Sequence, residues 1–100
     1  MAVVTLSTVP QPPLWYDVPS VTLNDDTLRQ RKAKVLANMR QQGLDTLIIY
    51  ADKEHGGNFE YLTGFIPRFE EALLVVHRDG EAVLVLGNEN LKLASYARLE

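Results

Sequence analysis

The chain has 100 residues, enough for one domain around a single hydrophobic core. Its net charge of −3, from ten basic and thirteen acidic side chains, argues against a nucleic-acid partner, which would require a basic surface. There is no cysteine, and no apolar run reaches the ~18 residues that cross a bilayer. With a poor secretory signal at the N-terminus as well, the sequence favours a cytoplasmic protein that contacts neither nucleic acid nor membrane.

Residues 1–24 predict an irregular leader. Four prolines in it fix backbone angles and remove hydrogen-bond donors, namely Pro10, Pro12, Pro13 and Pro19. The run Val3–Leu6 is apolar enough for a short strand. Residues 14–16 (Leu-Trp-Tyr) are too apolar for a free tail, so we expect them to pack either on this domain or on a partner.

A helix is predicted over residues 25–42. Apolar residues recur at intervals of three, four or seven, namely Leu28, Val35, Leu36 and Met39. The segment Asn24–Asp26 offers an N-cap and favourable negative charge at the positive end of the helix dipole. Gly43 is placed to end the helix in a left-handed conformation.

The next segments predict a strand, a polar loop and a short helix. Residues 46–51 (Thr-Leu-Ile-Ile-Tyr-Ala) are typical of a buried strand, which completes the helix–strand unit of an α/β layer. Residues 52–57 are polar, and residues 58–64 have the length of a helical turn. Loops that follow the carboxyl end of a strand often bind ligands in α/β sheets, which directs attention to His55 and Asn58.

Two further strands and a helix complete the prediction. Residues 72–77 and 82–86 are strands joined by a tight turn with Asp79-Gly80 at its two-residue centre. Neither strand alternates apolar with polar residues, so both faces are expected to be covered, in a mixed sheet between helical layers. Asn88 or Asn90 is expected to cap a helix that continues through Leu99. Because this helix would still be running at the last residue, the domain, residues 25–100, is expected to be incomplete.

Glu54 and His55 are the residues that come nearest to a metal or acid/base site. A zinc site needs three or four convergent ligands, and Asp52 would have to supply another from the same loop. We therefore predict no metal ligand and no catalytic residue in this chain. A loop hydrogen-bonded to its own backbone, a substrate contact through His55, and a small enzyme using Glu54 and His55 as an acid/base pair are the alternatives.

Several segments together closely resemble the creatinase/prolidase-type N-terminal domain. The resemblance rests on the stretch from Asn58 to Val76, on Arg29 and Arg31, on Gly43–Asp45 and on Tyr50–His55. The element Tyr61-Leu-Thr-Gly-Phe65 followed by two strands is its most specific part. It extends from about Asp25 to the end of the chain and leaves the leader unmatched.

The resemblance implies a three-layer α/β/α fold with ribonuclease H-like topology. Such domains precede the "pita-bread" catalytic domain of proline dipeptidase, aminopeptidase P and creatinase. That C-terminal domain holds a dinuclear metal centre of manganese, cobalt or zinc, whose ligands have no counterpart here. The N-terminal domain supports homodimerisation, and one of its loops reaches toward the partner subunit's active site.

The segment that corresponds to this loop is Gly64–Phe69, with His55 nearby. The resemblance makes His55, Phe65 and Arg68 candidates for the rim of the substrate site. Rigid aromatic rings offer contact area at low entropic cost, and a guanidinium can pair with a substrate carboxylate. The alternatives are that Phe65 and Phe69 belong to the local core and that Arg68 pairs with Glu70 or Glu71.

The function implied is that of a non-catalytic N-terminal domain of a metal-dependent Xaa-Pro peptidase. Two other functions stay open. The chain could belong to a creatinase-like amidinohydrolase, or it could be a freestanding binding or regulatory module of the same fold.

Overall fold

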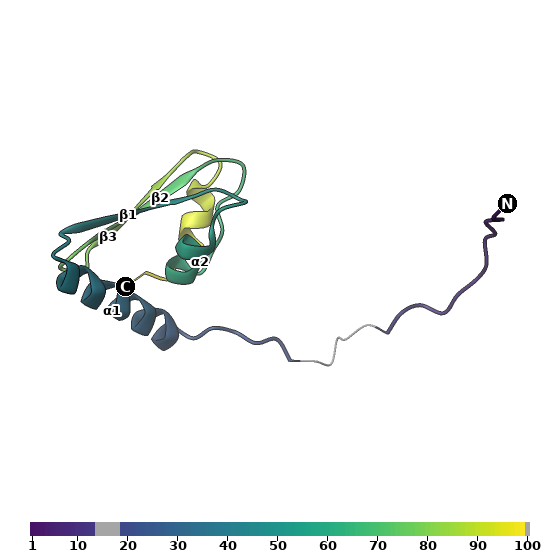
Figure 1. Ribbon diagram of the computed structural model, residues 1–100, viewed down its shortest axis with the longest axis horizontal. Helices are drawn as coiled ribbons and strands as arrows, with labels where there is room; N and C mark the ends of the chain where they lie inside the picture. The colour runs from purple at the N-terminus through teal and green to yellow at the C-terminus, as the bar shows by residue number, and fades with distance from the viewer. Residues whose placement is uncertain (14–18, 100) are drawn as a thin grey trace.

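The computed structural model describes residues 1–13 and 19–99. One long helix, a three-stranded sheet and two short helices form the folded part, and residues 19–24 lead into it as extended chain (Figure 1). Residues 1–13 and 19–24 have no regular secondary structure, including the run Val3–Leu6. The predicted packing of residues 14–16 lies outside the described residues.

Helix α1 spans Asp25–Gln42, with the predicted ends. Asn24 caps it, because its Oδ1 accepts a hydrogen bond from the Thr27 N–H at 2.9 Å. Gly43 ends it with φ of 70°, a conformation that costs glycine little. Met39 buries its side chain against the sheet, so tertiary packing stabilises the helix together with its caps.

The sheet consists of β1 (Thr46–Ala51), β2 (Ala72–His77) and β3 (Ala82–Leu86), in the order β1-β2-β3. Both pairings are antiparallel, with Ile48 opposite Val75 and Leu74 opposite Leu84. The mixed sheet expected from the sequence is therefore not what the described residues form. A polar loop and a short helix connect β1 to β2. They bring the chain back so that β2 runs beside β1 in the opposite direction.

The turn between β2 and β3 is longer than predicted. His77 N–H donates to Glu81 O at 2.8 Å, so three residues close the hairpin instead of two. Gly80, the last of the three, has φ of 101°, and the Glu81 N–H donates to Asp79 Oδ1 at 2.9 Å. A single positive φ after a tight turn gives this three-residue form, whereas a two-residue turn of the Asp-Gly kind needs two.

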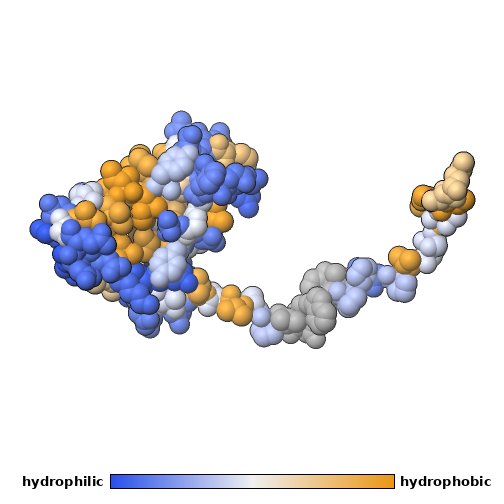
Figure 2. Space-filling view, in the orientation of Figure 1, coloured by the Kyte–Doolittle hydropathy of each residue, from blue (hydrophilic) through white to orange (hydrophobic). Residues whose placement is uncertain are grey.

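The core lies on one face of the sheet only. Side chains from both α-helices, from alternate strand positions and from the loop after the second α-helix form it, namely Met39, Ala51, Phe59, Leu62, Phe65, Ala72, Leu74 and Val76. The opposite positions form an open face of apolar side chains, namely Ile48, Tyr50, Leu73, Val75, Val83 and Val85. Ile48 is 61% exposed. Hydrophobic residues gather over the strands between polar ends of the domain (Figure 2). In the described residues helices cover one face of the sheet, so the three-layer arrangement stays a prediction.

The last predicted helix is shorter and of another type. A 3-10 helix, η1, spans Leu91–Tyr96 and gives way to extended chain at Ala97. Asn90 precedes it, but its side chain makes no cap hydrogen bond to this helix. The side chain bonds to residues 68 and 70 instead, so tertiary contacts outweigh the local capping preference.

Candidate functional site

The Tyr61–Phe65 motif ends helix α2, which spans Gly57–Thr63. The buried Thr63 hydroxyl donates to Phe59 O at 2.8 Å, and it accepts from the Phe65 N–H at 3.3 Å. Gly64 follows with φ of 83°, a left-handed conformation that glycine adopts without strain. Both residues therefore serve the structure of the motif, because the hydroxyl satisfies backbone groups and the glycine turns the chain toward the loop that follows.

Phe65 lies in the core and is only 9% exposed. Its ring meets the edge of Phe59 in a T-shaped pair, with centroids 5.2 Å apart and an interplanar angle of 84°. The structure thus places Phe65 in the local core, which was the alternative to a position at the rim of the substrate site. A direct contact between Phe65 and a substrate or partner is not available in this conformation.

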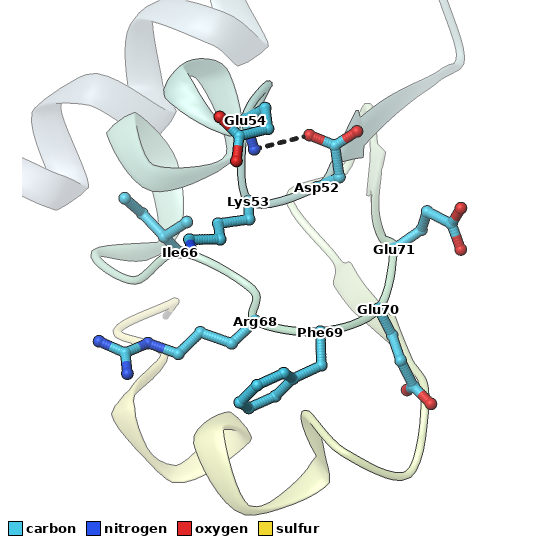
Figure 3. A pocket seen from close by; sticks show the side chains of 8 residues that line it. All are labelled: Asp52, Lys53, Glu54, Ile66, Arg68, Phe69, Glu70 and Glu71. Carbon is cyan, nitrogen blue, oxygen red and sulfur yellow. Dashed lines mark hydrogen bonds between the residues drawn. The ribbon is translucent and has the colours of Figure 1, made fainter.

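Phe69 has the opposite placement. Its side chain is 84% exposed and lines an open hollow of about 810 Å³. The hollow lies between the loop after β1 and the loop before β2 (Figure 3). The residues that line it are Asp52, Lys53, Glu54, Ile66, Arg68, Phe69, Glu70 and Glu71. The sequence reasoning named Phe65 and not Phe69 as a rim candidate, whereas the fold buries Phe65 and exposes Phe69.

Arg68 also lines this hollow, and its backbone N–H donates to Asn90 Oδ1 at 2.8 Å. Its guanidinium extends away from Glu70 and Glu71 (Figure 3). Within residues 1–13 and 19–99, no carboxylate lies in ion-pair distance of it. The side chain is consequently placed to accept an anionic group from outside the domain, such as a carboxylate.

The loop after β1 is organised by Asp52. Its Oδ1 accepts from the Glu54 and His55 N–H groups at 2.9 and 2.6 Å, and its Oδ2 accepts from the Tyr50 hydroxyl at 3.2 Å. The His55 imidazole is largely exposed, with Nδ1 3.1 Å from Asp52 Oδ1. Of the alternatives for this loop, the structure shows hydrogen bonds to the loop's own backbone, and a substrate contact through His55 stays open. The sequence reasoning missed Asp52 as its centre, although an aspartate before a turn is the signal for this motif.

These contacts shift two pKa values. Partial desolvation would raise the pKa of Asp52, but the hydrogen bonds from His55, Tyr50 and Glu54 outweigh it and hold the pKa below the ordinary value of 3.8. Desolvation raises the pKa of Tyr50 above 10.0, and the hydrogen bond to Asp52 with the charges of Asp52 and Glu71 adds to the effect. The end of β1 is thus an electronegative site.

Titration of Tyr50 is expected to have its midpoint above pH 10.0, because partial desolvation, the hydrogen bond to Asp52 and the charges of Asp52 and Glu71 all disfavour the ionised phenol. The difference between the 295 nm titrations of the wild type and Tyr50→Phe isolates this phenol among four tyrosines. Since folding raises its pKa, its contribution to stability is present below pH 10.0 and lost as pH rises through the folded value. Asp52→Asn should move the midpoint down. A wild-type midpoint at or below pH 10.0 would contradict the contacts described for Tyr50.

Among the described residues, no three histidine, aspartate or glutamate side chains converge as a metal site requires. Glu54 and His55 share a loop, but Glu54 contributes only its backbone N–H to the network around Asp52. The helices of the described ranges are also too short or too polar to cross a membrane. The expectations that the chain binds no metal and has no catalytic residue stay predictions.

The fold and the site together define a small α/β domain. One face of its sheet is open, and the loop organised by Asp52 lies beside an acidic hollow. The family model of the creatinase/prolidase N-terminal domain matches residues 31–97. The chain belongs to this family. The match confirms the resemblance found in the sequence, and domains of this family normally occur with a C-terminal catalytic domain. No curated protein and no solved structure shows significant similarity to the chain.

Proposed function

We propose that the chain is the non-catalytic N-terminal domain of a metal-dependent Xaa-Pro peptidase. The observation that carries the proposal is the family match over residues 31–97. In such an enzyme a divalent metal, manganese, cobalt or zinc, would activate the attacking water in the C-terminal pita-bread domain. The residues of the present chain would bind and orient, and none would take part in bond cleavage.

The hollow beside residues 66–71 would form part of the active-site rim in the partner subunit of a homodimer. Phe69 provides apolar contact area there, and the Arg68 guanidinium can pair with the carboxylate of a short peptide. His55, exposed on the neighbouring loop, provides a further polar contact. This arrangement supports a role in recognition, because it offers contact groups without a nucleophile or a metal ligand set.

The same proposal accounts for the open face of the sheet. In the complete protein, a second helical layer would cover Ile48, Tyr50, Val83 and Val85 and produce the three-layer, ribonuclease H-like arrangement. Large exposed apolar side chains in one continuous patch are typical of a surface that another element covers. The sequence supports this as well, because the strands are apolar on both faces.

The test combines this chain with the pita-bread catalytic domain encoded in the same genome. The two are expressed as one polypeptide or as two, whichever the genome encodes. Hydrolysis of Xaa-Pro dipeptides is measured with Mn²⁺, Co²⁺ or Zn²⁺. The chain alone is expected to give no turnover. The assembled enzyme should be dimeric and should lose at least about tenfold in kcat/KM without this domain, because positioning of the substrate is lost.

Turnover of an Xaa-Pro dipeptide by the pure chain would refute the proposal, and so would full activity of the catalytic domain without it. If the pure chain does turn over a small amide, His55→Ala shows whether Glu54 and His55 act as an acid/base pair. A catalytic domain that ignores this chain would favour the freestanding binding module. Turnover of creatine instead of dipeptides by the assembled enzyme would favour the amidinohydrolase.

A further inference from the structure

Residues 68–70 form a γ-turn with Phe69 at its centre. The Glu70 N–H donates to Arg68 O at 2.8 Å, and Phe69 has φ of 68°. A γ-turn whose central residue has positive φ is rare and strained, more so for a residue with a large side chain. Within residues 1–13 and 19–99, Phe69 is the one residue other than glycine with positive φ. The loop holds this phenylalanine in place at a cost to stability.

Asn90 clamps the turn from both sides. Its Oδ1 accepts from the Arg68 N–H at 2.8 Å, and its Nδ2 donates to Glu70 O at 3.4 Å. The asparagine is completely buried, and its backbone is fixed by a bond from its N–H to Gly87 O at 3.0 Å. Strained backbone persists where the surrounding structure over-determines it, and these bonds supply that constraint.

Glu70 adds a third support. Its carboxylate lies against Gly87, where a Cβ atom would collide with it, and it accepts from the Glu89 N–H at 3.3 Å. The turn is thereby fixed to the segment between β3 and η1 by its backbone and by one side chain. These contacts hold the backbone of Phe69 and leave its ring 84% exposed.

We propose that Phe69 is the residue through which the loop contacts the partner subunit, and that Asn90 is the positioning residue that holds it. This inference rests on the proposed function and goes beyond it by identifying the strained turn at Phe69 and the side chain of Asn90 as the structure that holds the contact. A rigid aromatic ring offers large contact area at little further entropic cost on binding. Strain maintained at a residue that is 84% exposed is accounted for by a contact outside this domain.

The charges around Phe69 indicate the chemistry of the surface it meets. The hollow is lined by four carboxylates (Asp52, Glu54, Glu70 and Glu71) and by two cations (Lys53 and Arg68), so its lining has a net charge of −2. The complementary surface on the partner subunit is an apolar socket bordered by basic side chains. Association through it weakens as salt concentration rises, because salt screens exposed charges.

The first arm of the test uses the chain alone and does not depend on the proposed function. Phe69→Gly is expected to raise the thermal midpoint, because glycine adopts positive φ without strain, whereas Phe69→Ala leaves it nearly unchanged. In the wild type, Phe69 should give the strong intraresidue amide-to-Hα NOE of a residue with positive φ. Asn90→Ala should abolish this NOE and speed amide exchange at Arg68. Should Asn90→Ala fail to fold, the same NOE and amide exchange are measured in Asn90→Asp. This variant retains the acceptor for the Arg68 N–H and loses the donor to Glu70 O.

The second arm uses the assembled enzyme. Phe69→Ala and Phe69→Gly are each expected to weaken dimerisation and raise KM for an Xaa-Pro dipeptide by at least about tenfold, with kcat within about twofold, as for the loss of a central aromatic contact. Asn90→Asp should produce a smaller change in the same direction. Tyr96→Ala is the matched control, since it removes an aromatic ring that is 66% exposed outside the loop. It should leave both quantities unchanged.

The outcomes separate the two proposals. An active dimer that tolerates Phe69→Ala within twofold would overturn the inference and leave the proposed function standing. An assembled wild type without dimerisation or Xaa-Pro hydrolysis would overturn the proposed function, and the partner contact of Phe69 with it. A thermal midpoint that Phe69→Gly does not raise, or an NOE that survives in Asn90→Ala, would overturn the positioning role of Asn90 in either case.

Discussion

Replacement of Phe59 by alanine is expected to remove a large part of the domain's free energy of unfolding. The Phe59 side chain is fully buried between α2 and the sheet and forms the T-shaped pair with Phe65. Truncation of a buried phenylalanine costs about 3–5 kcal/mol, because burial is lost and a cavity remains. A native domain has about 5–15 kcal/mol of unfolding free energy in total, so this loss is a large fraction of it. Urea denaturation followed by far-ultraviolet circular dichroism measures the loss.

Phe69→Ala provides the matched control, because the same side chain is removed ten residues further along the chain. Its ring is mostly solvated, so the free energy of unfolding should change by less than about 0.5 kcal/mol. Equal losses in the two variants would show that Phe69 packs in the core, against its observed exposure. A negligible loss for Phe59→Ala would mean that the core is not centred on the α2–sheet contact.

The elements fixed by local chemistry could be predicted from the sequence. Asn24 and Gly43 determine the ends of α1 through groups within a few residues of them, so their effect is visible in a short window. The apolar runs 46–51, 72–77 and 82–86 became β1, β2 and β3 within the predicted bounds. The family resemblance was equally visible, because the Tyr61–Phe65 motif combines a helix end and a turn whose residues are individually constrained.

The coverage of the sheet could not be predicted in the same way. A strand that is apolar on both faces indicates that each face favours an apolar environment, but it does not say which element covers it. In the described residues α1, α2 and η1 all lie on the side of Leu74, and the side of Ile48 stays open (Figure 1). The antiparallel direction of all three strands was missed for a related reason. Strand direction depends on the path of the segments that connect the strands, and the apolar pattern of a strand does not contain that path.

The clamped turn depends on contacts that a local pattern does not contain. An asparagine before an apolar run predicts a helix cap, yet Asn90 bonds to residues that precede it by 20 and 22 positions. The same limit applied to Phe65 and Phe69, which have equal chemistry and lie four residues apart. The turn at Gly64 and the positive φ at Phe69 lie beside the two rings, and neither conformation is visible in the residue types of the two phenylalanines.

Opposite faces of the sheet should respond very differently to a charge. Leu74→Glu is expected to abolish folding, because Leu74 lies fully buried on the central strand within the apolar core cluster. Lost packing and the burial of a charged or newly protonated group together cost more than about 4 kcal/mol. Ile48→Glu should cost about 1 kcal/mol or less in the isolated chain, since that side chain is 61% exposed and only strand propensity is lost. Circular dichroism and urea denaturation compare the two.

The same pair tests the three-layer arrangement once the chain is joined to its catalytic partner. If a second helical layer covers the open face, Ile48→Glu buries a charge there and destabilises the assembled protein by several kcal/mol, although the isolated chain tolerates it. A mild effect in both settings would mean that the face stays exposed to solvent and that two layers are the complete fold. A severe effect already in the isolated chain would place Ile48 in the core and contradict the one-sided burial. The assembled state therefore decides between two and three layers, because only there can a covering element act on the Ile48 side chain.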